Sequence, residues 1–282
     1  MARLQGTILC VLLICLMATA ESSAQVVPAK GEIKGAALKH TPQSALGVVD
    51  QANVVLPVSV TRGAIFVGKW KESPSTSSEQ VPVVIFLHGS TGLGLKAIGE
   101  WQHWLAEHGI ASVAPDSFAL PDRVTYTSPI DKATYESIHA LRTSEIDLAL
   151  AAVTTMPWAR QDKIVLAGAS EGGSAVARYG KPGFAARIIY SWSCENNYFV
   201  QEHRTQVLVD QPILNVISSV DPFFSQANLW LGNPTAKGNC AEAFAANKRA
   251  TVVLIPGAPH TLINLPQARS VTRSFLDETL KR

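Results

Sequence analysis

The stretch KIVLAGASEGG, residues 163–173, places a serine among small residues directly after an apolar run. Such a run is typical of a strand that is buried on both faces of a parallel sheet. Gly168, Ser170 and Gly172 then form the pattern G-x-S-x-G. Glycines at these positions let the strand and the helix after it pass close to each other around a strained turn. The stretch therefore predicts a strand, a turn that exposes the hydroxyl of Ser170, and a short helix over residues 171–179.

Segments on both sides of this turn alternate between apolar runs and helical patterns. The apolar runs predict strands at 83–87, 110–114, 163–167, 187–192, 212–218 and 251–255. The helical patterns predict helices at 95–108, 133–156, 171–179, 241–247 and 267–280. Two β-rich stretches, 54–60 and 63–70, predict an antiparallel pair whose first member lies at a sheet edge because it contains Pro57. Strands that alternate with helices predict the α/β class, with a mostly parallel central sheet and helices on both faces.

Composition indicates one large domain after the N-terminal region. Apolar residues make up 47% of the 282 residues and charged residues 16%, which predicts a sizeable core and excludes a disordered chain. Residues 21–45 show no clear period and are expected to form an exposed N-terminal arm. Residues 46–282 contain no internal repeat or linker, so we expect one domain there. The 24 basic residues are scattered and the net charge is only +2, which argues against nucleic acid as a partner.

The first two dozen residues differ from the rest of the chain. Arg3 precedes the apolar run 8–17, and small residues follow up to Ala20. A basic start, a short apolar run and a small-x-small ending predict a secretory signal peptide over residues 1–20, with cleavage after Ala20 or after Ala24. The alternative is a membrane anchor, but the run is shorter than the roughly 20 residues that span a bilayer. We therefore expect an exported protein, periplasmic or secreted, with no stable membrane anchor after cleavage.

Export changes the number of cysteines in the mature chain. Two of the four cysteines lie within the predicted signal peptide, which leaves Cys194 and Cys240. An even number of cysteines in an oxidising compartment predicts a disulfide between them. The alternative is two separate buried thiols.

The hydroxyl of Ser170 needs a base to accept its proton and an acid to orient that base. In a fold of this kind the acid and then the histidine follow the serine along the chain. Only His203 and His260 come after Ser170, and His260 follows the last predicted strand, at the sheet edge where Ser170 is expected. His260 is therefore the candidate base.

The acid is expected between the serine and the histidine. Asp221 directly follows the strand predicted at 212–218, whereas Asp210 precedes that strand and falls at the opposite edge of a parallel sheet. An Asp-Pro pair also favours a turn by itself, and the catalytic role needs the same short loop. Asp221 is the candidate acid, with Glu195 as second choice.

A third requirement is a pair of backbone donors for the oxyanion of the reaction. The stretch VVIFLHGSTGLG, residues 83–94, predicts a strand followed by a loop of small residues, which is a usual source of one donor. We expect the amides of Ser90 and Glu171 to form the pair, with Thr91 as the alternative to Ser90. His88 is expected to be a structural hydrogen-bonding residue.

The segments FLHGSTG, VAPDSF, GASEGG, VDP and APHT follow one another in this order. Together they resemble the α/β-hydrolase superfamily and, within it, the dienelactone-hydrolase-like branch, from about residue 46 to the end. The resemblance implies the α/β-hydrolase fold, no metal, no organic cofactor and a structural role for Asp116. Dienelactone hydrolases are known for a cysteine nucleophile where this chain has Ser170. That departure shifts the expected substrate from dienelactone to another carboxylic ester or lactone.

The expected function is hydrolysis of a small-molecule ester or lactone by Ser170, His260 and Asp221 through an acyl-enzyme. A peptidase or a polyester depolymerase with the same triad is one alternative. A non-catalytic binding protein with this fold is another, although no member of the triad is missing. Two long inserts, 193–211 and 223–238, carry or adjoin aromatic residues that either line the pocket or hold the inserts on the body. These are Trp192, Tyr198, Phe199, Phe223, Phe224 and Trp230.

Overall fold

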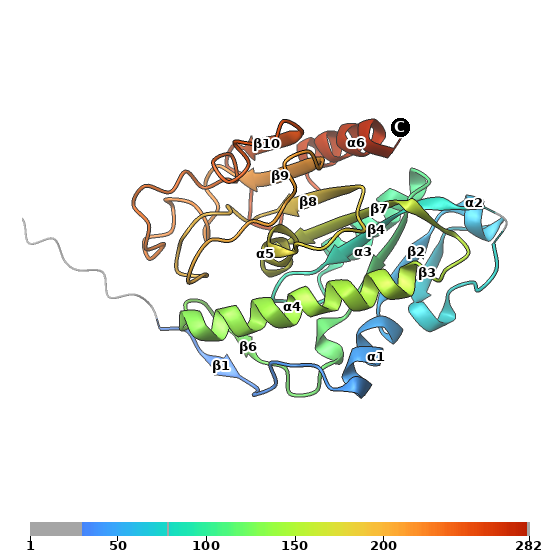
Figure 1. Cartoon of the computed structure of the whole chain (residues 1–282), viewed down its shortest axis with the longest axis horizontal. Helices are drawn as coiled ribbons and strands as arrows, with labels where there is room; N and C mark the ends of the chain where they lie inside the picture. The colour runs from blue at the N-terminus through green and yellow to red at the C-terminus, as the bar shows by residue number, and fades with distance from the viewer. Residues whose placement is uncertain (1–29, 78, 281–282) are drawn as a thin grey trace, which may run out of the picture.

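An eight-stranded sheet forms the centre of the computed structural model, which describes residues 30–77 and 79–280 (Figure 1). Its strands are β2 (Asn53–Leu56), β3 (Phe66–Lys69), β4 (Val81–Leu87), β5 (Ala111–Ala114), β7 (Ala159–Ala169), β8 (Ala186–Tyr190), β9 (Ile213–Ser218) and β10 (Ala250–Ile255). They lie in the order β10-β9-β8-β7-β4-β5-β2-β3. The six strands from β10 to β5 are parallel, and β2 runs antiparallel to both of its neighbours. The predicted α/β class with a mostly parallel sheet is confirmed. The predicted signal peptide lies outside the described residues.

Helices cover both faces of the sheet. The main ones are α3 (Lys96–Glu107), α4 (Lys132–Val153), α5 (Glu171–Arg178) and α6 (Pro266–Leu280). In β4, Val83 and Ile85 belong to the apolar cluster under α4 and α5, whereas Val84 and Phe86 belong to the cluster under α3 and α6. A strand buried on both faces has no polar alternation, which is why continuous apolar runs identified these strands. No helix within 30–77 and 79–280 has both the length and the hydropathy of a membrane span.

Two local predictions were wrong. Strand β3, not β2, lies at the edge of the sheet, because Pro57 follows the last residue of β2 and precedes the short helix α2 (Val58–Thr61). Pro57 has no backbone N–H to donate, and because it lies outside β2 the strand ladder loses no hydrogen bond. Residues 241–247 form turns, not a helix: their backbone bonds mix i−4 spacing at Phe244 with i−3 spacing at Ala245. So short a segment gains little from its helix propensity alone.

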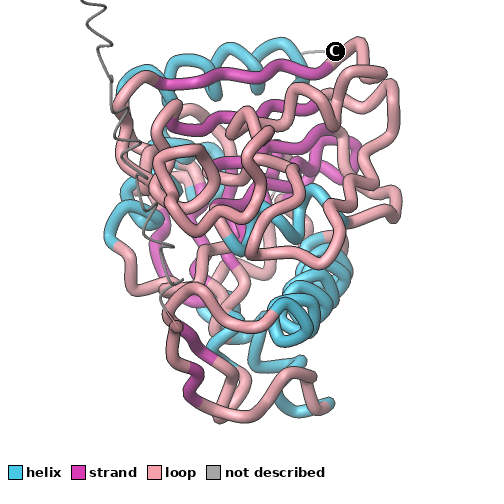
Figure 2. Tube along the Cα trace, turned by 90° about the vertical axis from the view of Figure 1, so that its left-hand side faces the viewer, coloured by secondary structure: helices cyan, strands magenta, loops and turns pink. Residues whose placement is uncertain are grey.

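The described part of the predicted N-terminal arm is attached to the body of the protein. Strand β1 (Ile33–Lys34) pairs with β6 (Thr125–Tyr126), and Figure 2 shows this pair apart from the central sheet. Thr41 caps the N-terminus of helix α1 (Pro42–Asp50): its side chain accepts a hydrogen bond from the amide of Ser44 at 3.1 Å. Helix α1 was not predicted, because its nine residues are too few to show a clear apolar period after the cap.

Cys194 and Cys240 form a disulfide, as predicted. The bridge joins the long loop after β8 to the long loop after β9, and it spans 46 residues of sequence. A crosslink of this span restricts the unfolded chain by about 4 kcal/mol in the chain-entropy model.

We expect the double variant C194A/C240A to lose about 4 kcal/mol of unfolding free energy because its unfolded chain is no longer crosslinked. Urea unfolding followed by fluorescence measures the difference, and the wild type in a strong reductant is the matched control. Equal midpoints for the oxidised wild type and the variant would show that the bridge adds nothing to stability.

Candidate active site

The turn between β7 and α5 has a conformation that only small neighbours permit. Ser170 has φ 55° and ψ −118°, in the left-handed region. A Cβ atom on Gly172 would lie 2.2 Å from the carbonyl oxygen of Leu87, and one on Gly168 would lie 2.5 Å from that of Gly172. The Ser170 amide donates to the carbonyl of Tyr190 at 3.0 Å, which fixes the turn between β4 and β8. Gly168 and Gly172 thus allow the close approach of strand and helix that the sequence predicted.

His260 and Asp221 meet at the same edge of the sheet. His260 Nδ1 and Asp221 Oδ2 are 2.8 Å apart. Asp221 is fully buried, and its Oδ1 accepts from the amides of Phe223 and Phe224 at 2.9 and 3.1 Å. The carboxylate is therefore held rigidly and fixes the orientation of the imidazole, which leaves the other ring nitrogen, Nε2, for a different partner.

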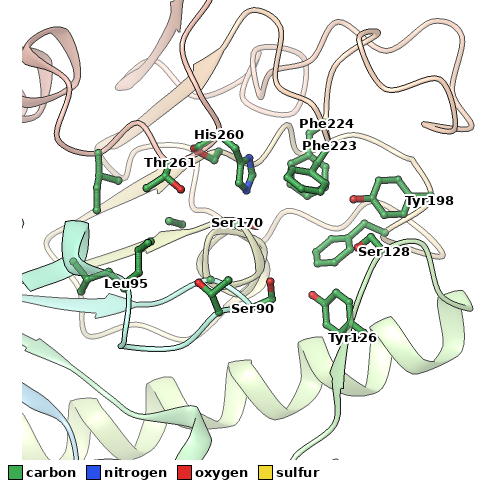
Figure 3. Close-up of a pocket in the computed structure, with 17 residues that line it drawn as sticks. Ser90, Leu95, Tyr126, Ser128, Ser170, Tyr198, Phe223, Phe224, His260 and Thr261 are labelled. Carbon is green, nitrogen blue, oxygen red and sulfur yellow. The ribbon is translucent and has the colours of Figure 1, made fainter. Parts of the chain in front are cut away.

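Ser170 and His260 line one cavity of about 170 Å³. In Figure 3 the imidazole of His260 projects into this cavity on the side of Ser170. Within the described residues no hydrogen bond joins the two side chains, so the structure brings Asp221 into contact with His260 and brings Ser170 to the shared cavity. Hydrogen bonds to a catalytic base often close only when substrate fills the site.

The loop after β4 passes directly over Ser170. A Cβ atom on Gly89 would lie 3.4 Å from the Cβ of Ser170, and the Gly92 amide donates to the Gly89 carbonyl at 3.2 Å. Ser90 and Thr91, the two alternatives for the oxyanion donor, both line the cavity. The Glu171 amide opens helix α5 on the other side, where the positive end of the helix dipole lies.

His88 has no free nitrogen for catalysis. Its Nδ1 donates to the Gly89 carbonyl at 2.6 Å, and its Nε2 accepts from the Ser117 amide at 3.2 Å and from Arg142 at 3.1 Å. Burial and the charge of Arg142 hold the pKa of His88 well below its usual value, so the ring is neutral. The structural role predicted for His88 agrees with this geometry.

A buried ionic network beneath the turn was not predicted. The Glu171 side chain is 0% exposed and lies 2.6 Å from Arg123 and 3.5 Å from Arg142. It also accepts a hydrogen bond from Tyr126 at 2.8 Å. Burial by itself raises the pKa of Glu171, but the two guanidinium groups and the Tyr126 bond outweigh it and hold that pKa below the usual value. The carboxylate is therefore ionised directly below the turn that carries Ser170.

The network continues to the N-terminal part of the chain. Arg142 lies 3.1 Å from Glu145, which also lies 3.1 Å from His40 and accepts from Ser117 at 2.5 Å. One signal in the sequence could have indicated it. Arg142 and Glu145, three residues apart, interrupt the apolar face of α4, and charged residues there must be paired.

The structure separates the other candidates by what they contact. Glu195 accepts from the amides of Lys237 and Gly238, and Asp116 accepts from the Phe118 amide. Of the aromatic residues of the inserts, Tyr198, Phe199, Phe223 and Phe224 line the cavity. Trp192 lies in the apolar core, and Trp230 packs on the ring of Tyr198 at 4.4 Å.

Residues 71–274 match the family model of the dienelactone hydrolase family. The chain belongs to this family. Its hydrolase fold and the order of its motifs agree with the resemblance found in the sequence. No curated protein matches the chain.

Solved structures share the fold at low sequence identity. A putative dienelactone hydrolase from Klebsiella pneumoniae is 16% identical with a TM-score of 0.52, and the match covers 74% of this chain and 90% of that one. A cold-adapted esterase from an Arctic intertidal metagenomic library is 17% identical with a TM-score of 0.51, covering 81% and 94%. A dienelactone-hydrolase-like promiscuous phosphotriesterase from metagenomic libraries is 20% identical with a TM-score of 0.50, covering 81% and 98%.

His139, on α4 below the aromatic side of the cavity, makes stability depend on pH. Its Nε2 donates to the Phe199 carbonyl at 2.9 Å, and burial lowers its pKa from 6.5 to about 4. Below pH 6.5 the unfolded chain binds a proton at this residue that the folded chain does not. Stability therefore falls as the pH falls from about 6.5 towards 4.

We expect the His139→Gln variant, whose amide can still donate to Phe199, to lose less stability on acidification. Between pH 7 and pH 5 the wild type should lose about 2 kcal/mol more than the variant. Urea unfolding at both pH values measures this difference, and His88 contributes equally to both proteins. The prediction is wrong if the free energy of unfolding falls by the same amount in the wild type and in the variant.

Proposed function

We propose that this chain is a serine hydrolase that cleaves small carboxylic esters or lactones through an acyl-enzyme. One observation carries the proposal. An imidazole that is fixed by a buried carboxylate at 2.8 Å shares a cavity with a serine on a strained strand-to-helix turn. Membership in a hydrolase family supports the same reaction.

In the first half of the reaction, Ser170 Oγ attacks the ester carbonyl carbon while His260 Nε2 takes the hydroxyl proton. The carbonyl π electrons move to the oxygen, and the amides of Glu171 and of Ser90 or Thr91 stabilise that oxyanion. The tetrahedral intermediate then collapses, the bond to the alkoxide breaks, and His260 gives its proton to the leaving oxygen. Ser170 now carries the acyl group.

In the second half, a water molecule gives a proton to His260 and attacks the acyl carbon. The new intermediate releases the carboxylic acid, and the proton returns from His260 to Ser170 Oγ. Asp221 stays ionised throughout, holds the Nδ1 proton and stabilises the imidazolium. Each oxyanion donor contributes about 3 kcal/mol to the barrier reduction.

The protein is proposed to act outside the cytoplasm. The disulfide between Cys194 and Cys240 is compatible with an oxidising compartment, and so is the signal-like sequence of residues 1–20. Its proposed partner is therefore a small-molecule ester or lactone of the periplasm or the medium.

A fluorophosphonate probe tests the proposal directly. The probe should label the purified protein at Ser170, as located by mass spectrometry, and a panel of p-nitrophenyl esters should be hydrolysed with a defined chain-length optimum. A lactone and a peptide anilide in the same panel separate an esterase from a peptidase. Absence of both labelling and turnover would favour a non-catalytic binding protein.

A further inference from the structure

Apart from His260, which already pairs with Asp221, the described lining of the cavity that holds Ser170 carries no group to neutralise an anionic substrate. Of the 17 described residues that line it, none is Lys, Arg, Asp or Glu. The two arginines beneath it are already committed: Arg123 binds Glu171 and the Val124 carbonyl, and Arg142 binds Glu145 and the His88 carbonyl. A carboxylate on the substrate would thus be buried without a partner, which is costly.

The two sides of the cavity differ in chemistry. Figure 3 shows Leu95 and Thr261 on one side of Ser170, and Tyr126, Ser128 and Tyr198 on the other. The second side is walled by five aromatic rings, those of Tyr126, Tyr198, Phe199, Phe223 and Phe224. The whole cavity, about 170 Å³, is only slightly larger than one known to hold a benzene molecule, about 150 Å³. Such walls suit a single flat ring.

The hydroxyl groups on the aromatic side have defined hydrogen-bonding roles. Tyr126 donates its proton to Glu171 at 2.8 Å, so its oxygen offers only lone pairs to the cavity. Ser128 accepts from Tyr135 at 2.8 Å and also pairs with the Tyr198 hydroxyl, so the Ser128–Tyr198 pair keeps one proton to donate. In Figure 3 the hydroxyl of Tyr126 points toward the centre of the cavity. A substrate hydroxyl both donates and accepts hydrogen bonds, so it can pair with this acceptor and this donor at the same time.

We propose that the site selects uncharged esters whose acyl or alkoxy part is a single ring bearing a hydroxyl group, and that it rejects esters and lactones that bear a carboxylate. Tyr126 and Ser128 are the specificity-determining residues for the hydroxyl. The proposal rests on the proposed function, because it assigns the substrate of the same serine.

Two series of ring-substituted esters test the proposal: methyl benzoates, with the ring in the acyl part, and benzyl acetates, with the ring in the alcohol. Each series carries a carboxylate, carboxamide, hydroxyl or methoxy group at the meta position, and each kcat/KM is divided by the rate of alkaline hydrolysis. Carboxamide and carboxylate have nearly the same shape and differ in charge. Hydroxyl and methoxy have similar electronic effects, and only the hydroxyl donates.

We expect the carboxamide to exceed the carboxylate at least about 100-fold in at least one series, because the site leaves the anion unpaired. The hydroxyl ester should exceed the methoxy ester about tenfold in that series. In Tyr126→Phe the ratio of hydroxyl to methoxy should fall towards one while the ratio of carboxamide to carboxylate persists. Ser128→Ala, which removes a hydroxyl of the donor half, should lower kcat/KM for the hydroxyl and the methoxy ester alike, because both ring oxygens can accept a hydrogen bond.

The controls separate this proposal from the proposed function. If the fluorophosphonate labels Ser170 but the carboxylate esters react as fast as the carboxamides in both series, the substrate assignment is wrong and the serine hydrolase stands. If Tyr126→Phe leaves the ratio of hydroxyl to methoxy unchanged and Ser128→Ala slows neither ester, these residues do not bind the hydroxyl. Failure of the probe to label Ser170 would overturn both proposals.

Discussion

Replacing Ser170 by alanine is expected to lower kcat for the best ester by a factor on the order of 10⁶. The hydroxyl oxygen is the atom that forms the acyl-enzyme, and no other side chain of the cavity is placed on the turn to replace it. A residual rate above that of water should remain, because the oxyanion donors and the binding surfaces are untouched. Initial rates at saturating substrate measure the loss.

The matched control for this prediction is Ser270→Ala, on the exposed face of α6. It changes the same atoms far from the cavity and should keep wild-type kcat. Ser170→Ala should also lose fluorophosphonate labelling while its unfolding midpoint stays close to that of the wild type. If purified Ser170→Ala keeps a tenth of wild-type activity, the acyl-enzyme mechanism is wrong.

The fold was predictable because its strands are buried on both faces. Continuous apolar runs such as Val83–Leu87 are too short for a buried helix and are separated by helical patterns, so they indicate strands. Where helix propensity was the only local signal, contacts with the rest of the fold determined the secondary structure. The alanine-rich segment 241–247 has helix propensity but forms turns between the disulfide at Cys240 and strand β10.

The candidate site residues were predictable for a different reason. In a parallel sheet, loops that follow strands meet at one edge, so Ser170, Asp221 and His260 could each be placed by the strand before them. The pairing of Asp221 with His260 follows from that placement. Asp210, on the other end of the same strand, is exposed and far from this arrangement, as its position predicted.

The long-range contacts of the ionic network could not be predicted, because their partners are distant in sequence and no motif links one partner to the other. His40 lies 105 residues from Glu145, and Arg123 lies 48 residues from Glu171. Burial of four charged side chains is a property of the folded chain, and each charge needs a partner only once the loops have closed around it. Nothing in the sequence distinguishes a buried Glu171 or Arg123 from the same residue on the surface.

Replacing Asp221 by asparagine is expected to lower kcat by a factor on the order of 10⁴. The amide oxygen of Asn can still accept from the backbone of Phe223 and Phe224, so the loop should keep its shape. The amide nitrogen would then face His260 Nδ1, where it favours the tautomer that carries its proton on Nε2. In that tautomer the ring cannot take the proton of Ser170. The lost negative charge also no longer stabilises the imidazolium.

Asp210→Asn is the matched control for this prediction, because Asp210 is exposed and precedes β9 at the opposite edge of the sheet. It makes the same chemical change and should leave kcat within a factor of about two, as expected for a surface substitution. Steady-state kinetics of both variants, with their unfolding midpoints, separate lost catalysis from lost folding. If Asp221→Asn folds normally and retains more than a tenth of wild-type kcat, His260 does not depend on this carboxylate, and Glu195 or a two-residue mechanism must be considered in its place.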